Sequence, residues 1–200
     1  TNLLASTYEK VVGIDKSNEA LKHVKAEKIS GSIDYMPFPD NGFDLVVCSE
    51  VLEHLPQGIY KQAILELQRV SNKYIIISVP NDEPIEQEFV KCDECGCVFN
   101  ASRHLRSFNE EKIQTLLETC RIQKYVFCGT LREDYNKLLL DMKRLFGGGW
   151  ENPTNALCPQ CGSKNTYKSR RNIFTLTIGF LNRIIPHKKQ KRWIIALYKK

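Results

Sequence analysis

The sequence predicts an α/β protein built on a doubly wound, mostly parallel β-sheet. Two observations carry this prediction. Short apolar, β-branched runs of the kind found in buried parallel strands recur along the first part of the chain, and segments with helical spacing separate them. The 200 residues, 42% apolar and 26% charged, suit a globular chain that buries a core as one domain, or as one domain with a small insert.

The expected elements follow in order. A helix tail opens the chain at residues 2–8. The expected strands cover residues 11–15, 29–33, 43–47, 74–79, 122–127 and 193–198. The expected helices cover residues 17–24, 58–70, 109–119, 131–146 and 173–185. The last of these also shows a strand-like alternation, and we favour a helix that ends before Pro186.

The segment FDLVVCSEVLEHLP, residues 43–56, holds a cluster of polar side chains after a buried strand. Glu50, Glu53 and His54 stand at positions i, i+3 and i+4, which predicts that they share one face of a helix. This face would lie beside the carboxyl end of the strand, the edge where ligands bind in open α/β sheets.

Acidic residues end the two strands before this segment. Asp15 ends one strand, and Asp34 stands at the end of the next. An acid at the first position can accept hydrogen bonds from both ribose hydroxyls of a nucleotide, and the second can accept one from an adenine amino group. The alternative is that both aspartates cap turns.

The sequence resembles class I S-adenosylmethionine-dependent methyltransferases. The matching stretches are VVGIDKS, GSIDYMPFPDNGFDLVVCSEVLEHLP, RHLRSFNEEKIQTLL and WIIALYKK, and the resemblance as a whole covers most of residues 1–128 plus 191–200. The resemblance implies a Rossmann-like sheet whose last strand is antiparallel. It also implies methyl transfer from S-adenosylmethionine to a small or anionic acceptor.

By this resemblance, Asp15 holds the ribose of the cofactor and Asp34 holds the adenine amino group. The residues implied to line the adenine slot and the methyl-transfer cleft are Ile33, Tyr35, Met36, Cys48 and Ser49. His104 falls in the HLRSF stretch, which the resemblance places in a loop near the substrate opening. A purely structural loop role for His104 is the alternative.

The catalytic candidates are Glu50, Glu53, His54 and His104. In the resembling ubiquinone-biosynthesis O-methyltransferases, E-x-x-E-H can hold a divalent cation beside a hydroxyl substrate, and such a cation lowers the pKa of the hydroxyl. Two alternatives stay open. Glu53 and His54 can be structural residues that pair locally, or His54 can act as a general base.

One part of the family pattern is absent. The first strand and the Gly-rich loop that cradles the methionine part of the cofactor should precede residue 1. We therefore expect the 200 residues to be an N-terminally truncated enzyme that binds the cofactor weakly and is inactive by itself.

Four cysteines form two CxxCG units. Cys92 and Cys95 make the first, and Cys158 and Cys161 make the second, far along the chain. Four thiolates can close a structural zinc site, and the glycine after each unit permits the tight turn. Neither unit has a thioredoxin-like context. The expected domains are a core of residues 1–128 and 191–200 and an insert of residues 129–190, tied by zinc to the knuckle at 92–97.

Charge divides unevenly along the chain. Residues 1–151 carry 18 Lys and Arg against all 23 acids, whereas residues 152–200 carry 11 Lys and Arg and no acid. The basic end indicates an anionic partner or simply a solvated face. Residues 173–192 suggest peripheral membrane contact, with packing of 173–185 on the domain as the favoured alternative.

The cysteine use and the lack of a long apolar run indicate a cytoplasmic protein. Peripheral membrane contact through residues 173–192 would add a membrane-peripheral location. The competing function is a non-catalytic zinc-ribbon module that binds nucleic acid or protein on a degenerate methyltransferase scaffold. Under that hypothesis, the basic residues from Lys168 onward would contact phosphates. Nucleic acid is the less favoured partner.

Overall fold

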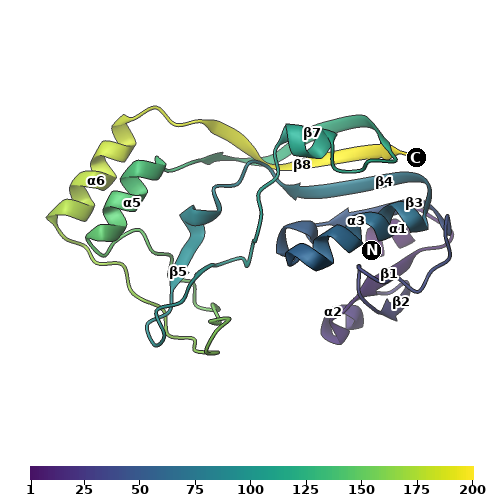
Figure 1. The fold of residues 1–200 in the computed structure, drawn as a ribbon, viewed down its shortest axis with the longest axis horizontal. Helices are drawn as coiled ribbons and strands as arrows, with labels where there is room; N and C mark the ends of the chain where they lie inside the picture. Colours follow the sequence, from purple (N-terminus) through teal and green to yellow (C-terminus); the bar gives the residue numbers. More distant parts are fainter. The chain divides into compact units, whose positions relative to one another are not determined.

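The computed structural model describes all residues from Thr1 to Lys200. The chain divides into two compact units, which are described separately. Unit 1 comprises residues 1–78, 111–125 and 196–200, and unit 2 comprises residues 79–110 and 126–195. The division differs from the expected one mainly at residues 79–110, which the sequence assigned to the core and which instead belong with the later cysteines. Figure 1 shows the order of the elements.

Unit 1 opens with a small parallel pair of strands. Helix α1 (Asn2–Ala5) leads to strand β1 (Val12–Asp15), and helix α2 (Asn18–Lys22) connects β1 to strand β2 (Glu27–Ser30). The two strands pair in parallel register, with Val12 opposite Glu27 and Asp15 opposite Ser30. The hydroxyl of Ser17 accepts a hydrogen bond from the backbone N–H of Ala20 and caps α2, as expected.

The larger sheet has the strand order β3-β4-β8-β7. Its strands are β3 (Phe43–Ser49), β4 (Ser71–Pro80), β7 (Arg121–Glu133) and β8 (Lys189–Lys199). Strands β3 and β4 are parallel. Strand β8 runs against β4, because the N–H of Lys200 donates to Lys73 at one end and the N–H of Asn81 donates to Arg192 at the other. The expected antiparallel last strand is therefore present.

The sheet is in two parts rather than one. Strand β1 pairs only with β2, and β3 pairs only with β4. In the doubly wound order 3-2-1-4-5-6, one further parallel strand lies between the strands that correspond to β1 and β3 here. Residues 1–200 contain no such strand, so the backbone groups that it would pair with lie on the edges of β1 and β3.

Helix α3 (Gln57–Val70) supplies one side of the unit 1 core. Its side chains Ala63, Leu67 and Val70, at helical spacing, are buried. Strand β4 contributes Ile75 and Ile77 from alternate positions, as expected for a strand with one buried face. The short helix α4 (Glu110–Gln114) and the last residues of β8 join the same unit.

The C-terminal residues are fixed by hydrogen bonds within unit 1. The hydroxyl of Tyr198 donates to the carbonyl of Ile113 over 2.6 Å, and Tyr198 is fully buried. The ammonium of Lys200 donates to the carbonyls of Gln68 and Ser71, over 2.8 and 2.9 Å. These bonds secure the end of β8 to α4, to the last turn of α3 and to the first residue of β4.

Unit 2 contains a short hairpin and two helices. The 3₁₀ turn η2 (Ile85–Glu88) precedes strand β5 (Phe89–Lys91), which pairs antiparallel with β6 (Val98–Asn100). The helices are α5 (Lys137–Leu145) and α6 (Ile173–Ile184). Helix α6 confirms the helical assignment of residues 173–185, and its N-cap Asn172 forms a reciprocal capping box with Thr175.

Several expected boundaries were wrong. Strand β2 ends at Ser30 rather than at residue 33, because residues 32–35 form a turn. Residues 131–133 belong to strand β7 instead of opening helix α5. The helix expected over 109–119 spans only Glu110–Gln114. The glycine run at 147–149 does end α5, where Gly147 adopts a φ of +81° that L-residues avoid.

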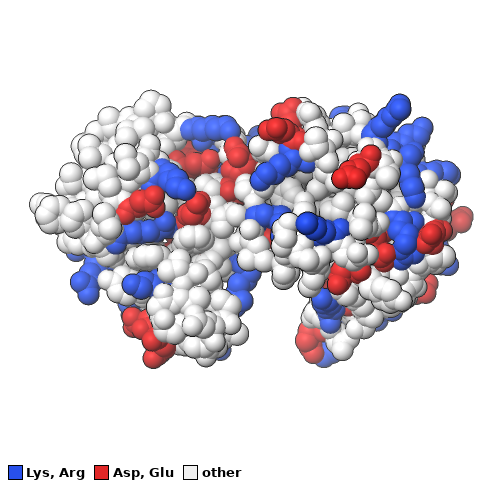
Figure 2. Space-filling view, viewed as in Figure 1, with Lys and Arg blue, Asp and Glu red and all other residues white.

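Charged and uncharged surfaces are distributed differently in the two units. Figure 2 shows Lys, Arg, Asp and Glu interspersed over much of the visible face, with a largely white area at the upper left, where Figure 1 places α6.

None of the helices is long and apolar enough to cross a bilayer.

Candidate functional site

Asp15 lies at the carboxyl end of β1, where the sequence placed it. Its side chain is exposed, and one carboxylate oxygen accepts a hydrogen bond from the N–H of Ser17 over 2.7 Å. The N–H of Gly31, in the loop after β2, donates to the Asp15 carbonyl over 3.1 Å. The first residue after β2 therefore bonds to the last residue of β1, and the second carboxylate oxygen of the exposed Asp15 can accept bonds from diol hydroxyls.

The loop after β2 holds Asp34 in a tight turn. The N–H of Tyr35 donates to the carbonyl of Ser32 over 3.1 Å, and the Ser32 hydroxyl donates to the Asp34 carboxylate. The Ser32 hydrogen bond, followed by a backbone N–H, lowers the pKa of Asp34 below its usual value. Asp34 is therefore an ionised acceptor, although it lies in a turn beyond the strand rather than at its end.

The three residues around Asp34 face different surroundings. The Tyr35 side chain is 81% exposed and Ile33 is partly buried, whereas Met36 is only 5% exposed. Tyr35 thus presents a ring to solvent beside Asp34, and Met36 packs into the interior. These positions stay predictions for an adenine slot.

A buried ion pair on α3 secures the Asp34 loop, which sequence reasoning missed. Glu66 accepts a hydrogen bond from the N–H of Met36 over 2.7 Å and pairs with Arg69 over 2.6 Å. The Arg69 guanidinium also donates to the carbonyls of Met36 and Phe38 and to Asp40. The Arg69 hydrogen bonds hold the pKa of Glu66 below its usual range, against the opposing effect of burial. The available signal was Glu66 and Arg69 at i, i+3 on α3.

The end of β3 carries Cys48, Ser49 and Glu50. Burial, with a further contribution from Glu53, raises the pKa of the Cys48 thiol to about 12, so it stays protonated. Ser49 is exposed. Glu50 has a φ of 54°, a left-handed conformation that costs energy for a residue with a side chain.

The expected shared helix face of Glu50, Glu53 and His54 was wrong. Helical structure starts only at the 3₁₀ turn η1 (Leu52–His54), and the left-handed Glu50 lies before it. The Glu50 N–H donates to the carbonyl of Ser78 over 2.9 Å, and the Ser78 hydroxyl donates to the Glu50 carboxylate over 3.0 Å. Glu50 is thus tied to the end of β4 instead of lying over Glu53.

Glu53 and His54 occupy contrasting positions. The Glu53 side chain is fully buried, whereas the His54 ring is partly exposed, with Nε2 at 3.8 Å from a Glu53 carboxylate oxygen. Leu52 in the same turn is also fully buried. The turn therefore sets a carboxylate inside unit 1 and an imidazole at its surface.

His104 belongs to unit 2, in the loop after β6. Its Nδ1 lies 2.5 Å from a Glu83 carboxylate oxygen, and both side chains are largely buried. The N–H of His104 donates to the Asn100 side chain over 3.1 Å, and that of Ser102 donates to the same oxygen. The Glu83 carboxylate fixes the orientation of the His104 ring and favours a proton on Nδ1.

The two CxxCG units come together in unit 2. All four sulfur atoms of Cys92, Cys95, Cys158 and Cys161 lie within 4.8 Å of one another. The Sγ atoms of Cys92 and Cys161, and those of Cys95 and Cys158, are 3.6 Å apart, and none forms a disulfide. Four thiolates at a Zn–S distance of about 2.3 Å in tetrahedral geometry would lie about 3.8 Å apart. The cluster therefore fits zinc closely.

The backbone around each cysteine pair forms the same tight turn. Gly96 donates to the Cys92 carbonyl and Gly162 to the Cys158 carbonyl, with φ values of +71° and +73°. Burial raises the pKa of the Cys158 thiol, but backbone N–H groups and neighbouring thiols outweigh it and lower the pKa to about 6. In the same cluster, burial and the neighbouring thiols raise the pKa of the Cys95 and Cys161 thiols despite backbone N–H groups that act in the opposite direction, as expected where thiolates would lie close together.

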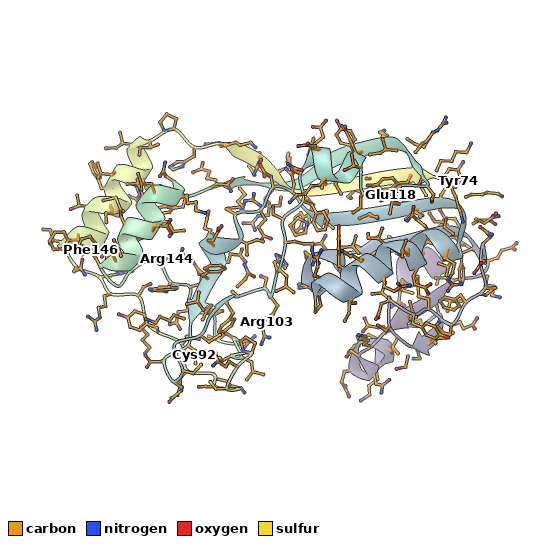
Figure 3. All side chains as sticks on the ribbon, in the orientation of Figure 1. Tyr74, Cys92, Arg103, Glu118, Arg144 and Phe146 are labelled. Carbon is orange, nitrogen blue, oxygen red and sulfur yellow. The ribbon has the colours of Figure 1, made fainter.

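Two of the four clustered cysteines, Cys92 and Cys158, also belong to a small apolar cluster; Figure 3 labels Cys92 and Arg103 in this part of unit 2. The Arg103 guanidinium lies over the ring of Phe99 and donates to the carbonyl of Leu157, which links the β6 side to the second CxxCG unit. Cys97 packs against the edge of the cluster and is outside the group of four. The buried members of the cluster are Val90, Cys92, Phe99, Ala156 and Cys158.

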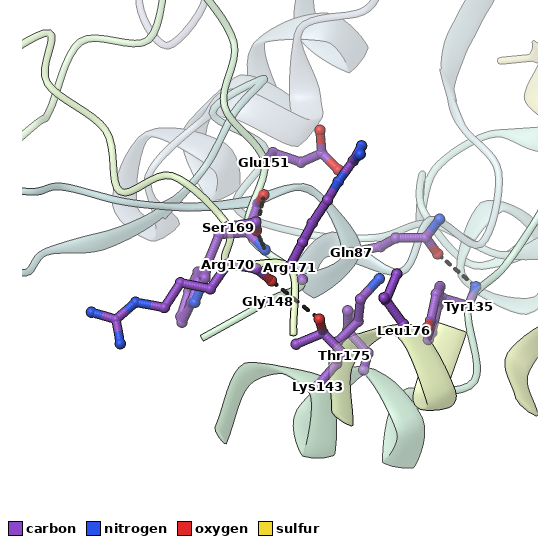
Figure 4. Close-up of a pocket in the computed structure, with 13 residues that line it drawn as sticks. Gln87, Tyr135, Lys143, Gly148, Glu151, Ser169, Arg170, Arg171, Thr175 and Leu176 are labelled. Carbon is purple, nitrogen blue, oxygen red and sulfur yellow. Dashed lines mark hydrogen bonds between the residues drawn. The ribbon is translucent and has the colours of Figure 1, made fainter. Parts of the chain in front are cut away.

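Unit 2 also holds a cavity of about 380 Å³ between α5, the N-terminus of α6 and the segments 148–151 and 169–171 (Figure 4). Lys143, Arg170 and Arg171 line it, against one acid, Glu151. Tyr135 also lines it, and the Tyr135 hydroxyl is buried without a hydrogen-bond partner. Apart from the basic composition of residues 152–200, nothing in the sequence predicted this cavity.

Comparison with known proteins agrees with this architecture. Residues 1–74 match the family model described as a methyltransferase domain. The chain is 39% identical over 80 residues to an uncharacterised protein of Methanocaldococcus jannaschii, a match that covers 38% of this chain and 34% of the relative. It is 43% identical over 67 residues to an uncharacterised methyltransferase of Schizosaccharomyces pombe, covering 29% of this chain and 23% of the relative.

These matches span about a third and a quarter of the curated relatives. Among solved structures, an S-adenosylmethionine-dependent methyltransferase from Methanosarcina mazei has a TM-score of 0.52 at 15% identity, covering 100% of this chain and 85% of that one. At that identity the likeness concerns the fold. Residues 1–74 therefore match a methyltransferase domain in sequence, and the chain has a fold similar to that of the Methanosarcina mazei S-adenosylmethionine-dependent methyltransferase.

Proposed function

We propose that the protein takes part in methyl transfer from S-adenosylmethionine to an acceptor that is small or anionic. The observation that carries this proposal is the pair of carboxylates at Asp15, the last residue of β1, and Asp34, in the turn after the neighbouring parallel strand β2, both within the segment that matches a methyltransferase domain. That match favours the enzyme over the non-catalytic zinc-module alternative.

The chemistry of the two carboxylates suits the adenosine part of the cofactor. An exposed Asp15 would accept hydrogen bonds from the ribose hydroxyls, and the ionised Asp34 would accept one from the adenine amino group. When bound, the cofactor supplies an electrophilic sulfonium methyl group. The chain's own task is to position the cofactor and the acceptor for in-line transfer.

The Glu66–Arg69 pair supports this assignment as a positioning device. By binding the backbone of Met36 and Phe38, it fixes the loop that carries Asp34 and Tyr35. Substrate sites need side chains held to within a fraction of an ångström, and loops reach this only when other elements anchor them. Arg69 and Glu66 would thus act through Asp34 rather than on the cofactor itself.

His54 and the His104–Glu83 pair remain candidate groups for taking a proton from the acceptor nucleophile. A divalent cation held jointly by Glu50, Glu53 and His54 is not part of the proposal, because Glu50 bonds to Ser78 and does not lie on their turn.

Titration of chain 1–200 with S-adenosylhomocysteine, followed by amide NMR shifts, tests the cofactor assignment. We expect shifts at Asp15, residues 31–36 and Ser49 at millimolar ligand, and their loss in Asp15→Asn and Asp34→Asn. The affinity should be weak, because residues 1–200 include no Gly-rich loop ahead of β1. Micromolar affinity by calorimetry would show that this loop is dispensable. Unshifted amide signals at these positions would contradict the cofactor assignment.

We also propose that Cys92, Cys95, Cys158 and Cys161 hold one structural zinc ion. The sulfur spacing and the paired glycine turns support this. All four positions are protein ligands, so the site would be closed and would serve folding rather than catalysis. Elemental analysis of purified chain 1–200 should give one zinc per chain, and a metal-free folded chain would contradict the assignment.

A further inference from the structure

Helices α5 and α6 form an antiparallel pair within unit 2. The N–H of Asn136, before α5, donates to the Asn182 side chain near the end of α6 over 3.0 Å. At the other end, the Asn172 side chain donates to the carbonyl of Phe146 over 2.9 Å, and the Phe146 and Phe174 rings stack with centroids 4.5 Å apart. The side chains that these helices bury are Leu139, Leu140, Thr175 and Ile178.

The outward sides of both helices are apolar. Phe180 is 64% exposed on α6, and Leu145 is 83% exposed on α5. The exposed apolar side chains of α6 at helical spacing are Ile173, Leu176, Phe180 and Ile184. Those of α5 are Leu138, Met142 and Leu145. Figure 2 shows the corresponding surface as white, and apolar patches of this kind mark interaction sites.

Positive charge flanks this apolar surface. Arg170 and Arg171 precede α6, Arg183 lies in its last turn, and Lys143 lies on α5. None of these four side chains forms an ion pair within the chain. Residues 152–200 contain no acid, and Glu151 is the one acid that lines the adjoining cavity, so positive charge is in excess beside α6. The surface therefore suits a partner that is apolar and anionic at once.

The cavity beside the N-terminus of α6 adds a polar receptor to this surface. Lys143, Arg170 and Arg171 line it, and so does the exposed Leu176. Tyr135 also lines the cavity, and its buried hydroxyl has no hydrogen-bond partner inside the protein, so an unsatisfied polar group lies next to this cavity. A phosphate with an attached acyl chain would meet the cations in the cavity and the apolar stripe outside it.

We propose that the α5–α6 pair docks on a bilayer of anionic phospholipid, with α6 in the interface and a headgroup phosphate in the cavity. The 12 residues of α6 are about 18 Å long, too short to cross a hydrocarbon core of about 30 Å. They suit a helix that lies in the plane of the interface with its apolar side buried. This inference does not depend on the proposed methyl transfer.

Other occupants fit the surface less well. In a symmetric dimer, the same patch from two copies would meet, which would bring together the uncompensated charges of Arg170, Arg171 and Arg183. Nucleic acid would satisfy these cations but not the exposed Phe180 and Ile184. A phospholipid surface matches both features.

Vesicle flotation with chain 1–200 tests the proposal. The protein should float with phosphatidylcholine vesicles in which about a third of the lipid is phosphatidylglycerol, and should bind pure phosphatidylcholine at least tenfold less. Phe180→Asp combined with Ile184→Asp should reduce binding to the anionic vesicles at least tenfold. Lys143→Glu combined with Arg171→Glu should abolish the preference for phosphatidylglycerol. Phe180→Trp should show a blue-shifted emission with the anionic vesicles.

A matched control is Leu65→Asp, because Leu65 is an exposed leucine on α3 of unit 1 and should not affect flotation. Circular dichroism and zinc content check that each variant is folded. Two results would overturn the proposal. One is flotation that the Phe180→Asp, Ile184→Asp variant retains in full. The other is absence of flotation together with a concentration-dependent dimer that the same variant dissociates, since the face would then be a contact between copies.

Discussion

The two units are stabilised in different ways. Unit 1 buries many aliphatic side chains of helix α3 and strand β4, among them Leu67, Ile75 and Ile77. Around its cysteines, unit 2 buries only a small cluster that includes two of the metal-ligating cysteines, and it leaves many apolar side chains of α5 and α6 exposed. We therefore expect unit 1 to depend on its apolar core and unit 2 on the proposed zinc ion.

Metal removal should give the largest effect and should be confined to unit 2. Binding of a structural zinc contributes about 10 kcal/mol in small zinc-finger peptides. A chelator, or Cys95→Ser, should therefore eliminate amide protection and dispersed NMR signals in residues 89–103 and 148–170, while residues 43–78 keep theirs. Cys97→Ser is the control, because Cys97 lies outside the group of four and should keep the zinc. Equal loss of amide protection in both units would contradict the expectation that the metal stabilises unit 2 alone.

Truncation of a core side chain should give the next largest effect, and here unit 1 is the sensitive part. Leu67→Ala removes a buried side chain from α3 and should cost about 2–5 kcal/mol in the free energy of unfolding. Leu65→Ala, on the exposed side of the same helix, should change it by less than about 0.5 kcal/mol. Urea denaturation measures both. A similar cost for the two variants would mean that α3 is not packed as described.

Loss of the Arg69 side chain should have a smaller but more local effect. Arg69→Met leaves the Glu66 carboxylate without its cation and frees the carbonyls of Met36 and Phe38, so we expect a cost of about 1.5–3 kcal/mol. Arg69→Lys keeps the positive charge but loses the planar set of guanidinium N–H donors, so this variant should recover only part of the lost stability. Amide exchange should rise at residues 34–40 in particular. Unchanged exchange there would contradict the positioning role.

The smallest expected effect concerns acid stability. Arg69 holds the pKa of Glu66 below its unfolded value, which is about 4.3 for a free glutamate. The stabilisation from ionised Glu66 is therefore complete above that pH and is lost as the pH falls through the lower, folded-state value. Glu66→Gln should be less stable than the parent at pH 6, and the difference should shrink by pH 3. A constant difference in urea midpoint would assign the stability to hydrogen bonds alone.

The local sequence determined most of unit 1 and the metal site. The β-branched run before Asp15, the Ser17 cap and the spacing of Ala63, Leu67 and Val70 each specify an element from a few neighbouring residues. The CxxCG units predicted their own turns, because the glycine after the second cysteine sets the backbone there. These features depend on interactions within about one helical turn, so the printed sequence contains them.

Only the tertiary structure decided the remaining features. The spacing of Glu50, Glu53 and His54 is compatible with one helix face, but hydrogen bonds to Ser78 on β4 hold Glu50 in a left-handed conformation. Arg69 met its carbonyl partners, 31 and 33 residues away, only through folding. Likewise, which sides of α5 and α6 stay exposed depends on how the two helices pack. Long-range contacts of this kind have no periodic signature, because their partners come from unrelated parts of the chain.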